Sequence, residues 1–165
     1  MQQEIADLLK HDVFSSVRTR HLFTMSLKFP PPVSVGQTPN GHRVLALVTG
    51  GDVIGDRIRG TVIGGNDWVV IRPDGSFALD VRLAFRCESG AVVTMSYRGL
   101  RQGPPAIIQK LECGAEVDPA SYYLRIAPFF ETADPALAWL NGVVAIGIGH
   151  STSKVPVLYN VFEVL

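Results

Sequence analysis

Side chains that could carry out chemistry lie among apolar residues in two stretches of the chain, and the first stretch is "SFALDVRLAFR". Asp80 and Arg82 are two residues apart there, so a β-strand places both on one face. An acid and a guanidinium on one face could clamp a polar ligand, or they could pair with neighbouring strands. The alternating apolar residues from 77 to 85 favour the second interpretation, in which Asp80 and Arg82 lie on a solvated face.

The second stretch is "YYLRIAPFFET", which contains Arg125 and Glu131. Burial would raise the pKa of the Glu131 carboxyl and let it act as a general acid or base, whereas Arg125 or nearby amides would hold it as an anion. A structural ion pair between the two residues fits equally well. Trp68, Tyr97 and Trp139 could line an aromatic pocket with hydrogen-bonding edges, although such residues more often belong to a core.

The motifs of cofactor, metal and nucleophile chemistry are incomplete. The glycine-rich run "VVAIGIGHST" leads into a strand-like segment, whereas a dinucleotide site needs a helix there. Ser151 in "GHSTS" lacks the second glycine of a nucleophile elbow, so this run favours a polar hairpin. No two of the four histidines are two, three or four residues apart, the spacings that place two ligands on one side of a metal. We therefore predict neither a cofactor nor a metal site.

Composition narrows the class of protein. Lys plus Arg (15) balances Asp plus Glu (15), so no bulk charge attracts nucleic acid or an acidic membrane. Cys87 and Cys113 stand alone, no signal peptide is seen, and no apolar run reaches the roughly 18 residues of a membrane span. These features favour a cytoplasmic protein. We expect one domain over residues 1–165, with residues 1–20 as an N-terminal arm or a short helix.

The elements that must hold these side chains show mainly the two-residue period of β-strands. Apolar and polar residues alternate in "HLFTMSLKF", "SFALDVRLAFR" and "AVVTMSYRGL", and tight turns are offered by Asn40-Gly41, Asp74-Gly75 and Ser89-Gly90. The runs "DRIRGTVIGG" and "DWVVIR" are expected to form separate short strands around Gly64, Gly65 and Asn66. About nine short strands predict an all-β fold, a single antiparallel barrel or a sandwich.

Few helices are expected. Asp134 as N-cap, Pro135 at the first helical position and the Asn141-Gly142 stop predict one short helix. Apolar residues at helical spacing between positions 5 and 9 allow another at the N-terminus. The stretch from 101 to 118 is interpreted as a polar, glycine-bearing connection.

Three blocks of the sequence resemble one known family. They are "GGDVIGDRIRGTVIGGNDW", "RPDGSFALDVRLAFRCESGAVVTMSYRG" and "YYLRIAPFFETADPALAWLNGVVAIGIG", in that order and over about half of the chain. The chain is thereby similar to the domain-of-unknown-function family 3237, also called uncharacterised protein family 0311. The resemblance implies a compact, calycin-like β-barrel that forms a homo-oligomer and has no agreed activity.

The residues and the resemblance together lead to a functional hypothesis, although whether the chain is an enzyme stays open. We expect a pocket for a small organic molecule, anionic or aromatic, and cofactor-free acid–base chemistry of the isomerase, lyase or hydrolase type. The expected catalytic residues are Glu131, Tyr97 and Asp80. The expected ligand-binding residues are Asp67, Trp68, Arg82, Arg125, Trp139 and Asn141. The alternatives are a non-catalytic ligand-binding protein and an oligomeric interaction module.

Overall fold

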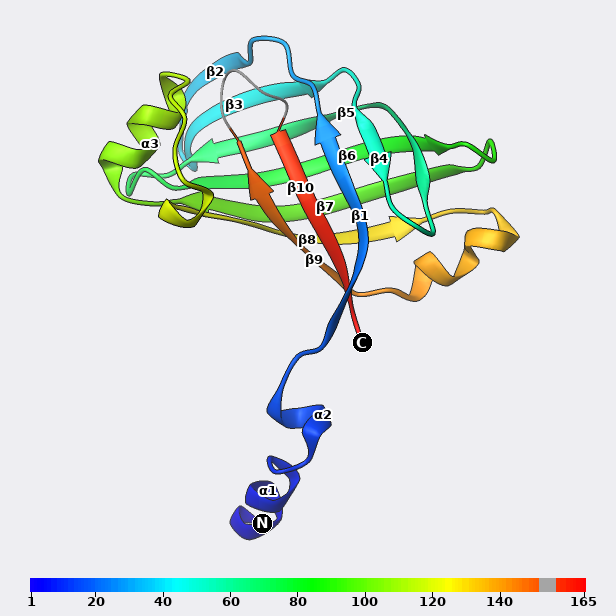
Figure 1. Ribbon diagram of the computed structural model, residues 1–165. Coiled ribbons are helices and arrows are strands. Elements are labelled where there is room, and N and C mark those ends of the chain that lie inside the picture. Colours follow the sequence, from blue (N-terminus) through cyan, green and yellow to red (C-terminus); the bar gives the residue numbers. More distant parts are fainter. Residues whose placement is uncertain (152–156) are drawn as a thin grey trace.

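The computed structural model describes residues 1–151 and 157–165 and shows an antiparallel β-barrel (Figure 1). Eight strands close the barrel, because the order β5-β4-β1-β10-β9-β8-β7-β6 ends where β6 pairs with β5 again. Their bounds are β1 (Thr19–Leu27), β4 (Asp52–Ile54), β5 (Arg59–Ile71), β6 (Phe77–Cys87), β7 (Val92–Gln102), β8 (Tyr123–Glu131), β9 (Ala145–His150) and β10 (Val157–Val164). The predicted antiparallel barrel is confirmed.

A hairpin extends one side of this barrel. It consists of β2 (Val33–Thr38) and β3 (Gly41–Val48), and β3 pairs with the second half of β5 while β4 pairs with the first half. The turn between β2 and β3 is the one predicted at Asn40-Gly41. Gly41 has a φ of +116°, and a Cβ there would lie 2.7 Å from a backbone oxygen of Ile71, so a side chain would be strained.

The strand β5 is one continuous element, so the prediction of two separate short strands was wrong. Its pairing with β6 shifts by one residue between Val62 and Gly64, which is a β-bulge. A Cβ on Gly65 would lie 2.2 Å from the backbone oxygen of Arg82, so the two strands approach too closely there for a side chain. The glycines therefore bend the strand without ending it.

The N-terminal arm carries the helices α1 (Gln2–Leu8) and α2 (Asp12–Ser15), and residues 1–20 are all exposed. Figure 1 shows this arm projecting away from the barrel, beyond the end at which the C-terminus lies. The N-terminal helix that the apolar spacing allowed is therefore present. Among the described helices, none is long and apolar enough to span a membrane.

Three further helical segments are α3 (Pro105–Glu112) and the 3-10 turns η1 (Pro119–Ser121) and η2 (Pro135–Gly142). The predicted short helix is η2, and its cap is as expected, because Asp134 accepts a 2.8 Å hydrogen bond from the Ala136 amide. The prediction of a polar connection between 101 and 118 missed α3. Its core-facing residues Ile107, Ile108 and Leu111 lie within five positions, too short a run to stand out as a period.

The core fills the barrel end nearer the C-terminus. The rings of Phe85 and Phe130 both pack edge-on against Phe23, with centroids 5.9 Å apart in each pair. Alternate residues of β6 and β7 point into the same interior; they are Val81, Leu83, Phe85, Cys87, Val93, Met95 and Tyr97. The predicted hairpin after Gly149 falls largely on residues 152–156, which lie outside the described residues.

Candidate functional site

The barrel interior is hollow at the end covered by α3 and the β2–β3 hairpin. A cavity of about 450 Å³ lies there, a size within the range of small-molecule sites. Its walls are mainly apolar; they include Val44, Ala46, Val69, Ile71, Phe77, Leu79, Leu111 and Leu124. Four ionisable side chains also line it, and they come from β5, β7, α3 and β10: Asp67, Arg101, Glu112 and Tyr159.

Asp67 is the buried acid of this cavity. It lies on β5 opposite Val81, so it shares the inward face, and only 7% of the residue is exposed. Its Oδ1 accepts a 3.1 Å hydrogen bond from the Asp80 amide, at a place where the β5–β6 pairing is interrupted between Asp67 and Val70. Burial raises the pKa of the carboxyl to about 6, because the charged form loses its hydration. Asp67 therefore titrates close to neutral pH.

Arg101 is the buried cation of the cavity. It lies at the end of β7, four residues after Tyr97 and on the same face of the strand. Its guanidinium carbon is 3.8 Å from the centroid of the Phe77 ring, and its Nη2 is 4.0 Å from Glu112 Oε1. The Nε atom is buried, and among the described residues it has no hydrogen-bond partner. Burial lowers the pKa of Arg101, yet an arginine keeps its proton in proteins.

Two buried tyrosines pack against each other beside the cavity. Tyr159 lines the cavity, and Tyr97 packs edge-on behind it with ring centroids 5.8 Å apart. Burial raises the pKa of both hydroxyls, so both are neutral near pH 7. A neutral phenol can donate and accept a hydrogen bond, which suits it to orient an oxygenated ligand.

These groups can perform proton transfer. A carboxyl group with a pKa near the working pH can accept a proton in one step and return it in another. A fixed guanidinium stabilises negative charge that develops on an oxygen atom. Apolar walls strengthen both effects because they exclude water.

Only two of the nine predicted site residues belong to the lining or the immediate backing of this cavity. They are Asp67, predicted as ligand-binding, and Tyr97, predicted as catalytic. Asp80 and Arg82 lie on the outer face of β6, where their side chains form an exposed ion pair with a nitrogen–oxygen distance of 3.3 Å. This is the solvated face that the apolar alternation favoured.

Three predicted residues, Trp68, Asp80 and Arg125, gather on the outer wall of the barrel. They line an open groove of about 820 Å³ across β5 to β9. The Arg125 Nη1 donates a 2.9 Å hydrogen bond to the Leu124 carbonyl, and its guanidinium carbon lies 4.8 Å from the Tyr123 ring centroid. The carboxyl group that lines this groove, Asp80, belongs to the exposed ion pair with Arg82.

Glu131 is exposed at the far end of β8, opposite Thr94. Arg125 and Glu131 lie six residues apart on one strand, which separates them by about 20 Å. The predicted ion pair between them is therefore not formed. The geometric reason is that six residues of β-strand extend the chain, whereas the pairing needs a turn. Glu131 does not meet Asp80, Tyr97 or Arg125 in a common cavity.

Trp139 and Asn141 lie in η2, near the packed end of the barrel. Asn141 Oδ1 accepts a 2.8 Å hydrogen bond from the Thr132 amide, and its Nδ2 donates a 3.0 Å bond to the Thr132 carbonyl. The Arg57 guanidinium lies 4.2 Å from the Trp139 ring centroid. Both residues thus make contacts that hold η2 against the barrel.

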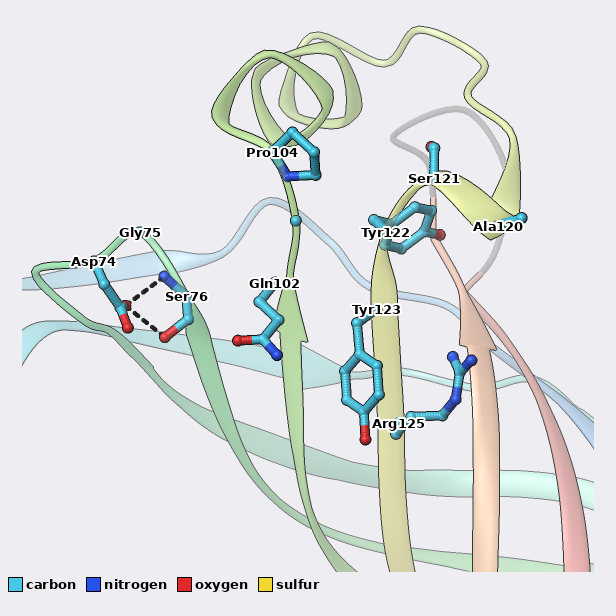
Figure 2. Close-up of a pocket in the computed structure, with 11 residues that line it drawn as sticks. Asp74, Gly75, Ser76, Gln102, Pro104, Ala120, Ser121, Tyr122, Tyr123 and Arg125 are labelled. Atoms are coloured by element: carbon cyan, nitrogen blue, oxygen red, sulfur yellow. Dashed lines mark hydrogen bonds between the residues drawn. The ribbon is translucent and has the colours of Figure 1, made fainter.

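Figure 2 shows another hollow, of about 600 Å³, where the β5–β6 turn faces Pro104 and the start of β8. Its one carboxylate belongs to Asp74, which accepts hydrogen bonds of 2.6 and 2.9 Å from the hydroxyl and amide of Ser76. These bonds lower the pKa of Asp74. The carboxylate is thereby committed to its own turn, so this hollow is a weaker candidate than the barrel cavity.

Sequence reasoning missed Arg101, Glu112 and Tyr159. The signal for Arg101 was the alternation through Val93, Met95 and Tyr97, which continues on the same face to residue 101. Tyr159 follows the same rule on β10, between Val157 and Val161. Glu112 had no such signal, because its helix was not expected.

Comparisons with known proteins agree on one family, whose function is unknown. A profile described as "Protein of unknown function (DUF3237)" matches residues 17–164. A UPF0311 protein of Rhodopseudomonas palustris strain TIE-1 is 37% identical over 133 residues, which are 80% of this chain and 87% of that protein. The crystal structure of a conserved protein of unknown function from Rhodopseudomonas palustris has a TM-score of 0.85 and 32% identity, covering 91% of this chain and 99% of that one.

A more distant likeness is to a crystal structure described as an enzyme from Penicillium herquei. It is 21% identical, has a TM-score of 0.68, and covers 90% of this chain and 95% of that one. At this identity the likeness concerns the fold alone.

Proposed function

Because the chain belongs to the DUF3237 family, whose function is unknown, we propose from its own cavity that it binds a small organic molecule and transfers a proton on it. Asp67 is the proton carrier in this proposal. The supporting observation is a carboxyl group with a pKa raised to about 6 that lines an apolar cavity together with a buried guanidinium. Active sites commonly shift a pKa in this way, by burial and by a specific charged neighbour.

The proposal moves the acid–base role from Glu131 and Asp80 to Asp67 and keeps Tyr97 in a supporting position. Glu131 and Asp80 face outward into solvent, so neither carboxyl group lines the cavity. Tyr159 would hydrogen bond to an oxygen of the substrate, and Tyr97 would fix the Tyr159 ring by edge-on packing. Isomerisation, elimination and hydrolysis of an oxygenated substrate all use such proton transfers without a cofactor.

The test compares the wild-type chain with Asp67→Asn. Each is incubated with a fractionated extract of small metabolites, and mass spectrometry follows which compounds change with time. We expect turnover of at least one compound by the wild type and a loss of roughly 100-fold or more in Asp67→Asn, as for other general acids and bases. Glu131→Gln is the matched control and should keep full turnover.

Two results would contradict the proposal. Full turnover by Asp67→Asn would remove Asp67 from the chemistry. Loss of turnover in Glu131→Gln alone, with an unchanged melting temperature, would return the acid–base role to the residue that the sequence indicated.

A ligand-binding protein without chemistry is the second candidate. The observation that favours it is the buried Nε of Arg101, which has no hydrogen-bond partner among the described residues and needs an acceptor whether or not a reaction follows. In that case compounds co-purify with the protein but do not change over time. The same mass-spectrometry experiment distinguishes the two.

A further inference from the structure

We propose that the barrel cavity is a site for an apolar organic carboxylate, whose carboxylate group binds Arg101 in place of Glu112. The inference rests on the proposed function only in using the same cavity. It adds the chemical class of the ligand and the residue that selects it.

The guanidinium of Arg101 is held against an aromatic ring. Its carbon atom lies 3.8 Å from the Phe77 ring centroid, so the ring contacts the flat face of the guanidinium and not the N–H groups at its edge. Its Nε is buried, and no described residue accepts a hydrogen bond from it. A buried donor without a partner destabilises the protein, because it has lost its hydration without gaining an acceptor. A ligand that supplies an acceptor at this edge recovers that free energy.

Glu112 does not fill this role. Its Oε1 is 4.0 Å from Arg101 Nη2, which is too long for a hydrogen bond, and its side chain is 53% exposed. Because Glu112 ends α3 at the cavity mouth, it can turn toward water when another anion approaches. Glu112 therefore acts as a weak counter-ion with which a ligand competes.

The apolar walls of the cavity favour an apolar body for the rest of the ligand. Val44, Ala46, Val69 and Leu124 offer no hydrogen bonds, so a charged or heavily hydroxylated body would lose its hydration without compensation. A carboxylate matches the planar fork of an arginine with two parallel hydrogen bonds. An apolar body with one carboxylate at its end satisfies both requirements.

The test measures binding of three acids and their neutral amides by calorimetry. The acids are benzoate, 2-naphthoate and octanoate, so that both flat and flexible bodies are represented. We expect at least one acid to bind the wild type roughly 10- to 100-fold more tightly than its amide, the range of charge-assisted hydrogen bonds. Arg101→Gln should abolish this preference, and Arg101→Lys should reduce it, because lysine keeps the charge without the fork.

Two variants serve as controls. Arg125→Lys changes the same residue type on the outer wall and should leave the preference unchanged. Glu112→Gln removes the competing anion, so it should strengthen binding of the acid and not of the amide. It also tests the proposal independently if an Arg101 variant proves unable to fold, which circular dichroism would show.

The proposal is overturned if none of the acids binds the wild type, or if acid and amide bind equally. It is also overturned if the preference survives Arg101→Gln or disappears in Arg125→Lys. Failure of the proposed function looks different, because the acid would then bind through Arg101 while no compound is turned over. Conversely, turnover that depends on Asp67 but prefers neutral substrates would contradict only the proposal that the ligand carries a carboxylate.

Discussion

The barrel holds two buried carboxyl groups in opposite electrostatic surroundings. Glu163, near the C-terminus, accepts hydrogen bonds from the side chains of Arg20 and Arg57, and the Arg20 bond is the main cause of its lowered pKa. Asp67, at the hollow end, has no ion pair among the described residues, and burial raises its pKa to about 6. The comparison shows how one chemical group serves as a structural contact at one end and as a candidate proton carrier at the other.

The packing of the barrel interior also differs between the Glu163 end and the Asp67 end. The aromatic rings around Phe23 fill the interior toward the Glu163 end, whereas the Asp67 end keeps a cavity of about 450 Å³. A close-packed interior contributes stability, whereas a hollow one loses packing contacts, and Arg101 Nε there has no hydrogen-bond partner among the described residues. We therefore expect changes at the two ends to separate stability from function.

The largest effect is expected from Phe85→Ala in the packed interior. Its ring is fully buried, so the substitution leaves a void and should lower the free energy of unfolding by about 3–5 kcal/mol. Leu79→Ala is the comparison. Because Leu79 borders a space that is already hollow, this substitution should lower the free energy of unfolding clearly less. Urea denaturation measures both, and equal losses would mean that the two regions are packed alike.

The next effect is that of Asp67→Asn on the pH dependence of stability. Because the folded pKa of about 6 exceeds the unfolded value of 3.8, the folded chain binds more protons between these values, and wild-type stability falls as the pH rises from 4 to 6. Asn retains the acceptor for the Asp80 amide and removes the titration. We expect the variant to match the wild type near pH 4 and to exceed it by up to about 3 kcal/mol at pH 7, at about 1.4 kcal/mol per pKa unit.

Parallel denaturation curves at several pH values test this. A wild-type curve that does not fall between pH 4 and 6, or falls equally in Asp67→Asn, would show that Asp67 is ionised normally.

Glu163→Gln should have a smaller effect and the opposite dependence on pH. The folded pKa of Glu163 is lowered, so its contribution is present above the unfolded pKa and is lost as the pH falls through the folded pKa. Because both arginine partners are partly exposed, the expected loss at pH 7 is about 1 kcal/mol, near the upper end for exposed ion pairs. The wild type and the variant should converge in acid. A difference that persists at low pH would assign the loss to packing.

The smallest effect is expected on the outer wall. Arg82→Gln breaks an exposed ion pair with Asp80 and should change stability by less than about 0.5 kcal/mol at any pH. A thermal-shift measurement suffices. A loss as large as that of Glu163→Gln would show that the outer wall, like the packed end, depends on its ion pairs.

Much of the fold could be predicted because its signals are local. The alternation in β6 and β7, the turn at Asn40-Gly41 and the Asp134 cap each depend on neighbouring residues only, and all three are found. The site was predicted less well. Asp67 lies with Arg101 and Tyr159 because β5, β7 and β10 meet around one closed barrel, and no local pattern encodes that meeting.

The sequence by itself determined the family, most of the β-strands and which residues share a strand face. Only the tertiary structure decided which inward faces meet in one cavity, since a two-residue period separates the two faces of one strand without saying which strands lie beside it. Closure of β5 on β6 enclosed Asp67 with a guanidinium and left Asp80 in water. Asp67 is paired with Val81, the residue next to Asp80. A slip of one residue in the pairing would exchange the inward and outward faces of a strand, so pairing between strands fixes which acid is buried.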